Sequence, residues 1–298
     1  MPMPESWTIK DLLRVSTDYL EEKQIDSPRL TAEVLLAFQL EMSRISLYLN
    51  LDQPLNESEV SGYRELIRRR IQREPLQYIT GVQEFWSLDF EVDPRVLIPR
   101  PETELLVEQA MAIHETLSTQ NATIDRILDL GTGSGALAIT LAKEIPDARI
   151  WATDISGGAI NLAARNAEKH EVSDRIEFIQ GDLWQPLMDQ GIAFDLVVSN
   201  PPYVSDEEYQ DLSPEVHDYE PRISLCGHEN GLYYVQEIIK GCKDVLSPGG
   251  WLLMEMSPGQ TEKALELIRS VETLEKGTRI RDYSHRYRVV ATQKRGLH

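Results

Sequence analysis

The chain has 298 residues, of which 41% are hydrophobic and 27% charged, proportions that are ordinary for a globular protein with a real core. No apolar run approaches the roughly 20 residues that cross a bilayer, and the amino terminus lacks the basic and apolar regions of a signal peptide. We therefore expect no membrane segment and a cytoplasmic location. The length fits two domains at about 150 residues each.

The formal net charge of −19 argues against tight nonspecific binding to nucleic acid, because an acidic surface repels phosphate backbones. Two local basic clusters remain, Arg68–Arg70 with Arg73 and the stretch from Lys276 to Arg295. A solvated face is the commoner explanation for such charge runs. The first cluster is also a candidate for docking a protein substrate, and we expect no direct nucleic-acid partner.

The cysteines and histidines show no metal-binding pattern. Cys226 and Cys242 have neither metal-ligand nor redox spacing, and the six histidines form no H-x-x-x-H motif. A disulfide between the two cysteines is an alternative, although buried or incidental thiols are typical of cytosolic chains. We predict no metal site, and nothing in the sequence calls for more than a monomer.

Residues 1–75 are predicted to form a small helical bundle. Ser27-Pro28 has the pattern of an N-cap followed by proline at the first helical position, and Asn56 with Glu59 resembles a capping box. Three stretches carry apolar or small side chains at helical spacing. They are Ile9, Leu12, Leu13, Ser16 and Leu20; Leu30, Val34, Leu35 and Phe38; and Val60, Tyr63, Ile67 and Ile71.

Residues 76–100 are predicted to form a β-hairpin linker. The alternation of apolar and acidic residues from Leu88 to Val92 is typical of a strand, and Pro94 and Pro99 punctuate the segment. A helix is expected to begin after Pro101, because acidic residues in the first turn of a helix are favoured by its dipole.

From residue 101 to 298, strand and helix patterns alternate, which predicts an α/β domain with a mainly parallel sheet covered on both faces. Residues 279–283 and 287–292 are close enough in sequence to pair as an antiparallel hairpin at the sheet edge. The expected strands are 126–130, 149–154, 175–180, 194–199 and 250–256, and helices include 136–143 and 158–170.

A glycine-rich loop follows the first of these strands. Glycines let a backbone turn sharply and approach a ligand, and a carboxylate at the end of the next strand suits ribose hydroxyls. Polar and aromatic residues after the third strand suit an adenine. The loop also satisfies the loose dinucleotide fingerprint, so a nicotinamide cofactor is an alternative. The candidate cofactor-binding residues are Gly131, Thr132, Gly133, Ser134, Gly135, Asp154, Asp182, Trp184 and Asn200.

The most informative motif is Asn200-Pro201-Pro202-Tyr203, which directly follows the fourth strand. The prolines fix a rigid turn with carbonyls free to accept hydrogen bonds, while Asn200 and Tyr203 add an amide and a flat aromatic face. Such a turn can hold a planar NH2 group, although the tetrapeptide alone also fits a surface turn. Its place beside the glycine loop favours S-adenosylmethionine, with the methyl group directed at this turn.

With both motifs placed, the chain resembles the S-adenosylmethionine-dependent protein-(glutamine-N5) methyltransferases of peptide chain release factors, the PrmC/HemK type. The resemblance covers nearly the whole chain, and the order of its motifs is more specific than any one of them. Besides the glycine loop and the Asn-Pro-Pro-Tyr turn, its segments are Glu74-Pro75-Leu76-Gln77-Tyr78-Ile79-Thr80-Gly81, Phe85-Trp86-Ser87-Leu88 and Leu97-Ile98-Pro99-Arg100-Pro101-Glu102-Thr103-Glu104.

The resemblance implies a Rossmann-like methyltransferase fold, with a mostly parallel seven-stranded sheet and an antiparallel edge hairpin, plus the helical domain. It implies that Asn200, Pro201, Pro202 and Tyr203 are the catalytic and substrate-binding residues. The acceptor would be the glutamine of the release factors' Gly-Gly-Gln motif. Three alternatives stay open: methylation of a ribosomal-protein glutamine or of adenine in nucleic acid, a nicotinamide oxidoreductase, and a cofactor-binding regulator without catalysis.

Two segments depart from the family pattern. Glu255-Met256-Ser257-Pro258-Gly259-Gln260 lacks the usual glycine directly after its apolar residue, and Cys226-Gly227-His228-Glu229-Asn230-Gly231 has atypical small residues. We expect both to be sheet-end or surface variations that alter local loops and leave the reaction unchanged.

Overall fold

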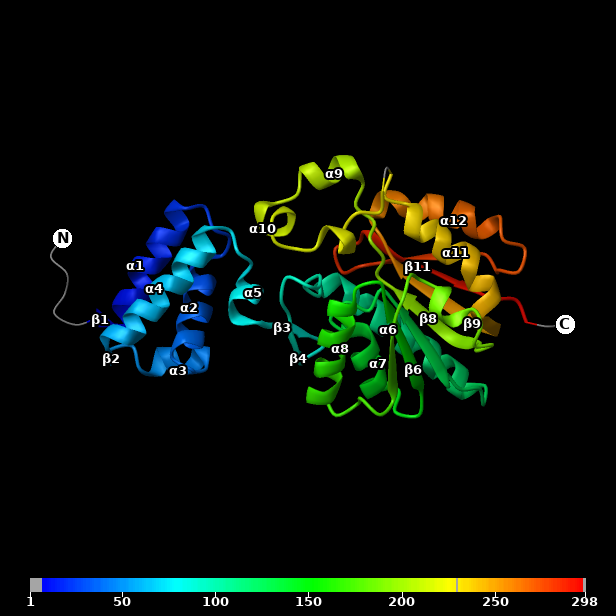
Figure 1. The fold of residues 1–298 in the computed structure, drawn as a ribbon, viewed down its shortest axis with the longest axis horizontal. Helices are drawn as coiled ribbons and strands as arrows, with labels where there is room; N and C mark the ends of the chain where they lie inside the picture. The colour runs from blue at the N-terminus through cyan, green and yellow to red at the C-terminus, as the bar shows by residue number, and fades with distance from the viewer. Residues whose placement is uncertain (1–6, 229, 297–298) are drawn as a thin grey trace. The chain divides into compact units, whose positions relative to one another are not determined.

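The computed structural model describes residues 7–228 and 230–296, which form two compact units (Figure 1). The helical unit extends to Gly81 and includes Pro214–Tyr219, whereas the sheet unit comprises Val82–Ser213 and the chain from Glu220 onward. Leu76–Thr80, at the start of the predicted linker, is a short helix of the helical unit. Residues 1–6 and Glu229, on which the signal-peptide and loop predictions partly fall, lie outside the described residues.

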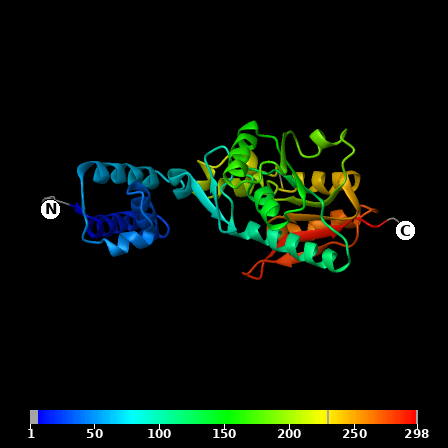
Figure 2. The same ribbon diagram turned by 90° about the horizontal axis from the view of Figure 1, so that it is seen from below.

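The helical unit is a bundle around its own apolar core (Figure 2). Its elements are β1 (Trp7–Thr8), α1 (Ile9–Glu22), α2 (Pro28–Gln39), α3 (Arg44–Leu49), β2 (Pro54–Leu55), α4 (Glu57–Ile71), α5 (Leu76–Thr80) and α10 (Pro214–His217). The two short strands pair antiparallel. The five residues expected to form one stripe of α1 are all buried, which confirms that helical period.

One predicted helix cap in this unit is confirmed, and another differs from its prediction. Asn56 and Glu59 form the predicted capping box at the start of α4. Ser27 precedes α2 as expected, but its left-handed φ of 48° leaves its side chain without a capping hydrogen bond. The expected apolar face of α2 was partly wrong, because Leu30 and Phe38 are exposed while α2 packs through its neighbouring small and aliphatic residues.

The predicted basic cluster is neutralised by acidic partners within the helical unit. Arg68 pairs with Glu65 and Arg69 with Glu74. Both Arg70, whose side chain is only 7% exposed, and Arg73 pair with Glu215 of α10. This pairing favours a structural role for the cluster.

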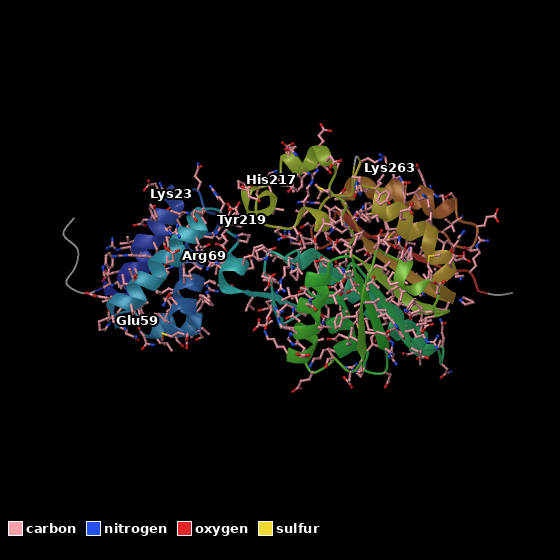
Figure 3. The ribbon with its side chains drawn as sticks, viewed as in Figure 1. Lys23, Glu59, Arg69, His217, Tyr219 and Lys263 are labelled. Carbon is pink, nitrogen blue, oxygen red and sulfur yellow. The ribbon has the colours of Figure 1, made fainter. Side chains whose placement is uncertain are left out.

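The segment Pro214–Tyr219 is distant in sequence from the rest of the helical unit and is held to it by side chains from α10 and Tyr219. The Tyr219 hydroxyl donates a hydrogen bond to the Gln72 carbonyl at 2.7 Å. Tyr219 and Arg69 are both labelled in Figure 3. The sequence patterns gave no sign of this long-range association.

The sheet unit contains a hairpin, a seven-stranded sheet and the helices that flank it. A turn of 3-10 helix, Pro101–Thr103, leads into α6 as expected. The elements are β3 (Val82–Phe85), β4 (Leu88–Glu91), α6 (Glu104–Thr119), β5 (Arg126–Leu130), α7 (Ala136–Glu144), β6 (Arg149–Asp154), α8 (Gly157–Lys169), β7 (Ile176–Gln180), β8 (Phe194–Ser199), α9 (Asp206–Gln210), α11 (Tyr233–Val245), β9 (Leu246–Glu255), α12 (Thr261–Arg269), β10 (Thr278–Arg281) and β11 (Tyr287–Gln293).

The sheet has the strand order β10-β11-β9-β8-β5-β6-β7, with β11 antiparallel to both of its neighbours and the remaining pairs parallel. This confirms the predicted α/β fold class and the β10–β11 hairpin. Neighbouring strand residues belong to different cores: Ile127 packs with α6 and α7, whereas Leu128 packs with α11 and α12. Helices therefore cover both faces of the sheet (Figure 1).

Within the described ranges, the helices are too short or too polar to cross a membrane. Among the same residues, no group of three or more histidine, cysteine or acidic side chains is arranged to hold a metal ion. Cys226 and Cys242 are both free thiols, and Cys242 is buried in the core.

Candidate active site

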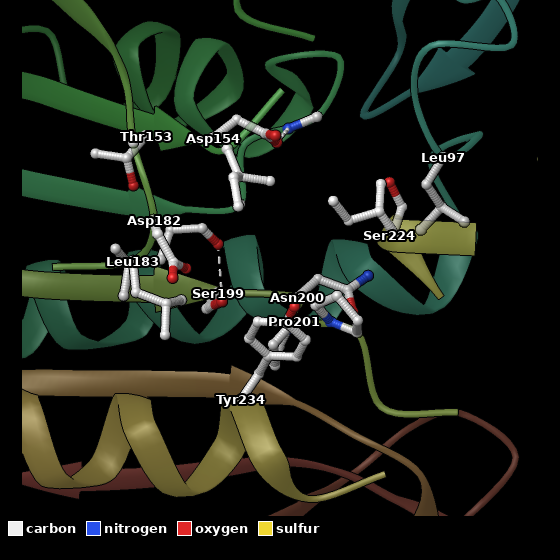
Figure 4. A pocket seen from close by; sticks show the side chains of 17 residues that line it. Leu97, Thr153, Asp154, Asp182, Leu183, Ser199, Asn200, Pro201, Ser224 and Tyr234 are labelled. Carbon is white, nitrogen blue, oxygen red and sulfur yellow. Dashed lines mark hydrogen bonds between the residues drawn. The ribbon is translucent and has the colours of Figure 1, made fainter. Parts of the chain in front are cut away.

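A pocket lies at the carboxyl ends of β5, β6 and β8, with about 670 Å³ of atom-free space, part of it open to solvent. Seven of its lining residues belong to the predicted site (Figure 4). They are Gly131, Gly133, Asp154, Asp182, Asn200, Pro201 and Pro202. The glycine loop and the Asn-Pro-Pro turn, about 70 residues apart, thus face one cavity, which is how adjacent parallel strands bring distant motifs together.

The glycine loop needs its glycines for conformation and for space. Gly131 and Gly133 have φ angles of 74° and 56°, which disfavour residues with a Cβ. A Cβ built on either would meet no atom within 4 Å, so the backbone borders open space. The buried Asp129 carboxylate holds the loop by accepting hydrogen bonds from Thr132 Oγ1 at 2.6 Å and from the Ala138 amide at 3.2 Å. Burial raises the pKa of Asp129 to about 7.

Asp154 links the loop to the end of β6. Its carboxylate accepts hydrogen bonds from the Gly133 amide and the Ser156 amide, both at 2.9 Å, and burial raises its pKa. Each carboxylate oxygen retains capacity for a further hydrogen bond. The neighbouring Thr153 lines the same pocket, and its buried hydroxyl has no hydrogen-bond partner among the described residues. Carboxylate acceptors beside a glycine cradle suit a nucleoside with a ribose.

Four of the predicted cofactor residues do not line this pocket. The Thr132 hydroxyl instead donates a hydrogen bond to Asp129, and the Ser134 carbonyl accepts one from Asn166 Nδ2 of α8. Gly135 caps the start of α7. Trp184 also lies outside the pocket lining: its ring is buried in the core and its Nε1 donates a hydrogen bond to the Glu237 carbonyl at 3.1 Å. The residue before it, Leu183, takes the pocket position.

A second, smaller cavity adjoins the first and shares Asn200 and Pro201 with it. Tyr203 and Arg100 line this second cavity. The loop that carries Arg100 is pinned by the buried Glu220, which accepts from the Ile98 amide at 3.1 Å and pairs with the Arg100 guanidinium.

A chain of hydrogen bonds lies behind the turn. Asn200 Nδ2 donates to Thr103 Oγ1 at 3.0 Å, and Thr103 Oγ1 donates to Glu255 Oε2 at 2.7 Å. The other Glu255 oxygen accepts from the Tyr203 hydroxyl at 3.2 Å. Glu255 is 1% exposed, and its burial raises its pKa. Burial together with the Glu255 charge raises the pKa of the Tyr203 phenol.

The two departures from the family pattern include the sheet end that was expected, because Glu255 is the last residue of β9. Glu255 and Gln260 are nevertheless buried against the Asn-Pro-Pro-Tyr turn and do not form a surface. Glu255 belongs to the buried network, and Gln260 Nε2 donates to the Tyr203 carbonyl at 2.7 Å. Gly227 and Gly231 also pack on the turn. A Cβ on Gly231 would lie 2.1 Å from the Tyr203 carbonyl oxygen, and one on Gly227 would lie 2.6 Å from that of Pro202. Both segments therefore contact the Asn-Pro-Pro-Tyr turn directly.

Several lining residues escaped the sequence interpretation. Ile223 and Ser224 line the pocket from a 3-10 turn, and Tyr234 lines it from the first turn of α11. Ser224 and Tyr234 are labelled in Figure 4. Leu97 belonged to a segment noted only for its resemblance to a family linker, and it borders both cavities. The sequence gives only a weak indication of these residues, because the side chains that line the pocket depend on how the loops fold over the sheet.

Comparison with known proteins agrees with this arrangement. The PrmC N-terminal domain matches residues 11–81, and the methyltransferase small domain matches residues 106–215. A release factor glutamine methyltransferase of Geobacter sulfurreducens is 46% identical over 267 residues, 89% of each chain. The chain belongs to the release factor glutamine methyltransferase family. A second member, from Chlorobaculum tepidum, is 41% identical over 91% of this chain and 92% of that one.

Solved structures support the same fold class. A methyltransferase from Pyrococcus furiosus superposes with a TM-score of 0.50 at 17% identity, covering 80% of this chain and 99% of that one. The hMettl16 catalytic domain, solved in complex with the MAT2A 3'UTR hairpin 6, superposes with a TM-score of 0.53 at 18% identity. That alignment covers 76% of this chain and 82% of the other. At these identities the likeness describes the sheet and its helices alone.

Proposed function

We propose that this protein transfers a methyl group from S-adenosyl-L-methionine to the side-chain amide nitrogen of the glutamine in the Gly-Gly-Gln motif of peptide chain release factors. The observation that carries the proposal is the common pocket of the glycine loop and the Asn-Pro-Pro turn in a member of this family. A cofactor site and an amide-holding turn are the two parts that such a transfer requires.

The residues of the pocket fit the cofactor. Gly131 and Gly133 provide backbone beside open space, and the Asp154 carboxylate provides hydrogen-bond acceptors for a ribose. When bound, S-adenosylmethionine supplies an electrophilic methyl group on a sulfonium sulfur, which leaves with the bonding electrons as the acceptor nitrogen bonds the methyl carbon. Leu183 and neighbouring apolar side chains would exclude water around the adenosine, and Asp182 would offer it a hydrogen-bond acceptor.

The turn would overcome the poor reactivity of an amide nitrogen, whose lone pair is delocalised into its carbonyl. Asn200 Oδ1 and the Pro201 backbone carbonyl would accept the two N–H protons and direct the lone pair toward the methyl donor. Since the nitrogen gains positive charge during transfer, these hydrogen bonds strengthen in the transition state. The nitrogen then releases one proton, so the products are N5-methylglutamine, S-adenosylhomocysteine and a proton.

The choice of a glutamine acceptor rests on the family, whose members from Geobacter sulfurreducens and Chlorobaculum tepidum carry release factor glutamine in their names. The net charge of −19 argues against the adenine of a nucleic acid as the acceptor, because phosphate would be repelled. A cytoplasmic location and a monomeric state are part of the same proposal.

The deciding experiment incubates the purified protein with methyl-labelled cofactor and a release factor, and compares it with a release factor whose Gly-Gly-Gln glutamine is replaced by alanine. We expect label in the first acceptor and none in the second. A ribosomal protein extract and DNA serve as competing acceptors. Transfer to either of these in preference to the release factor would overturn the proposed acceptor.

A further inference from the structure

The side of the acceptor turn that faces away from the two cavities is held by buried hydrogen-bonding groups that a methyl transfer does not itself use. We propose that Glu255 and Thr103 are positioning residues that fix the orientation of the Asn200 amide, so that its carbonyl oxygen faces the acceptor. The inference rests on the proposed function, since it assigns how the acceptor-holding turn is oriented.

The fold brings the three residues together at neighbouring strand ends. Ser199 of β8 lies opposite Met254 of β9 in the parallel register, so Asn200 and Glu255 leave adjacent strands side by side. Thr103 comes from the 3-10 turn before α6 and bridges them, within 3.0 Å of the Asn200 amide nitrogen and 2.7 Å of Glu255. Thr103 is itself buried.

With Glu255 ionised, the donors and acceptors of this hydrogen-bonded series permit one arrangement. A threonine hydroxyl has a single proton, and the Thr103 proton is donated to the Glu255 carboxylate. The hydroxyl oxygen then offers only lone pairs to Asn200, so it selects the NH2 end of that amide. The two ends of an asparagine amide have nearly the same shape, and their hydrogen bonds decide which way the group lies. Asn200 Oδ1 is therefore left for the acceptor.

The same carboxylate holds the other polar side chain of the turn. Its second oxygen accepts the Tyr203 hydroxyl at 3.2 Å, so one buried group restrains both ends of the tetrapeptide. Burial raises the pKa of Glu255, while its two hydroxyl donors and the charge of Arg288 oppose that rise and Glu102 adds to it. Because a higher pH favours the ionised, accepting carboxylate, all variants are assayed at one pH, about 8.

The test removes the hydroxyl group of Thr103 and keeps the shape of the side chain. Thr103→Val preserves the branched side chain, whereas Thr103→Ser preserves the hydroxyl and serves as the matched control. We expect Thr103→Val to lower kcat for release factor methylation by about 10- to 100-fold, less than the loss of a direct transition-state donor. Thr103→Ser should restore most of the rate, and isothermal titration should give an unchanged Kd for S-adenosylmethionine in both variants.

The outcomes separate this inference from the proposed function. If wild-type protein does not methylate the release factor, the proposed function fails. If the wild type is active and Thr103→Val matches its kcat, the positioning role is refuted. The role is also refuted if Thr103→Ser falls as far as Thr103→Val, because side-chain packing would then explain the loss. Should Thr103→Val fail to bind cofactor, Thr103→Ala replaces it under the same criteria.

Discussion

Asp129 makes the stability of the sheet unit depend on pH in a way that one substitution can reveal. Its carboxyl is fully buried at the end of β5, where Oδ2 accepts two hydrogen bonds and Oδ1, among the described residues, has no partner. Burial raises its pKa from 3.8 to about 7, and the nearby charge of Asp154 adds to the rise. Asp129→Asn keeps the size of the side chain and removes its titration.

The direction follows from proton binding. Below pH 3.8 the carboxyl is protonated in both the native and the unfolded chain, and its contribution to stability is complete. As the pH rises toward about 7, the native state retains a proton that the unfolded state has released, so the free energy of unfolding declines. At ~1.4 kcal/mol for each pH unit, the decline between about pH 5 and about pH 7 is ~3 kcal/mol.

Urea unfolding followed by tryptophan fluorescence measures this change, because four of the five tryptophans lie in the sheet unit. We compare wild type, Asp129→Asn and the exposed-site control Asp147→Asn at about pH 5 and about pH 8. Wild type and Asp147→Asn should lose ~3 kcal/mol more than Asp129→Asn between these conditions. Parallel pH dependence in wild type and Asp129→Asn would refute the reasoning.

Three further predictions concern the pocket. Asn200→Ala should lower methyl transfer by about 100-fold or more while keeping cofactor affinity, measured by single-turnover labelling and titration calorimetry; near-normal turnover would contradict the role of the turn. Gly133→Ala should weaken S-adenosylmethionine binding about 10-fold or more, whereas Gly191→Ala, also at positive φ but outside the pocket, should leave it unchanged. Trp184→Phe loses the hydrogen bond from Nε1 to the Glu237 carbonyl of α11, so the free energy of unfolding should fall by about 1 kcal/mol while cofactor affinity stays unchanged. Weaker binding of S-adenosylmethionine would instead support the predicted cofactor role of Trp184.

The sequence predicted the sheet well because buried parallel strands and glycine turns have strong local patterns. The five main strands and the edge hairpin lie within a few residues of their predicted bounds, and the pocket forms where strand ends meet. Gly131, Gly133, Asp154 and Asn200 could be predicted for the same reason, since each lies at the carboxyl end of a strand or within three residues of it.

What the sequence did not reveal depends on tertiary packing. Trp184 was assigned to the adenine because it follows a strand, but its large ring gains more from burial against α11, where Gly241 leaves room for it. Glu255 ends a strand without any local feature that distinguishes it from a surface carboxylate. Its role emerges only because Thr103, more than 150 residues earlier, folds onto it.

The assignment of Pro214–Tyr219 to the helical unit has a consequence for how the protein can be divided. A fragment ending at Gly81 would lack Glu215, leaving the buried Arg70 guanidinium without its acidic partner. A fragment beginning at Val82 would carry Glu215 and Tyr219 as a loop that has lost its arginine and backbone partners. A single cut in the chain cannot yield two intact halves, so an expression design for either unit has to graft or delete this segment.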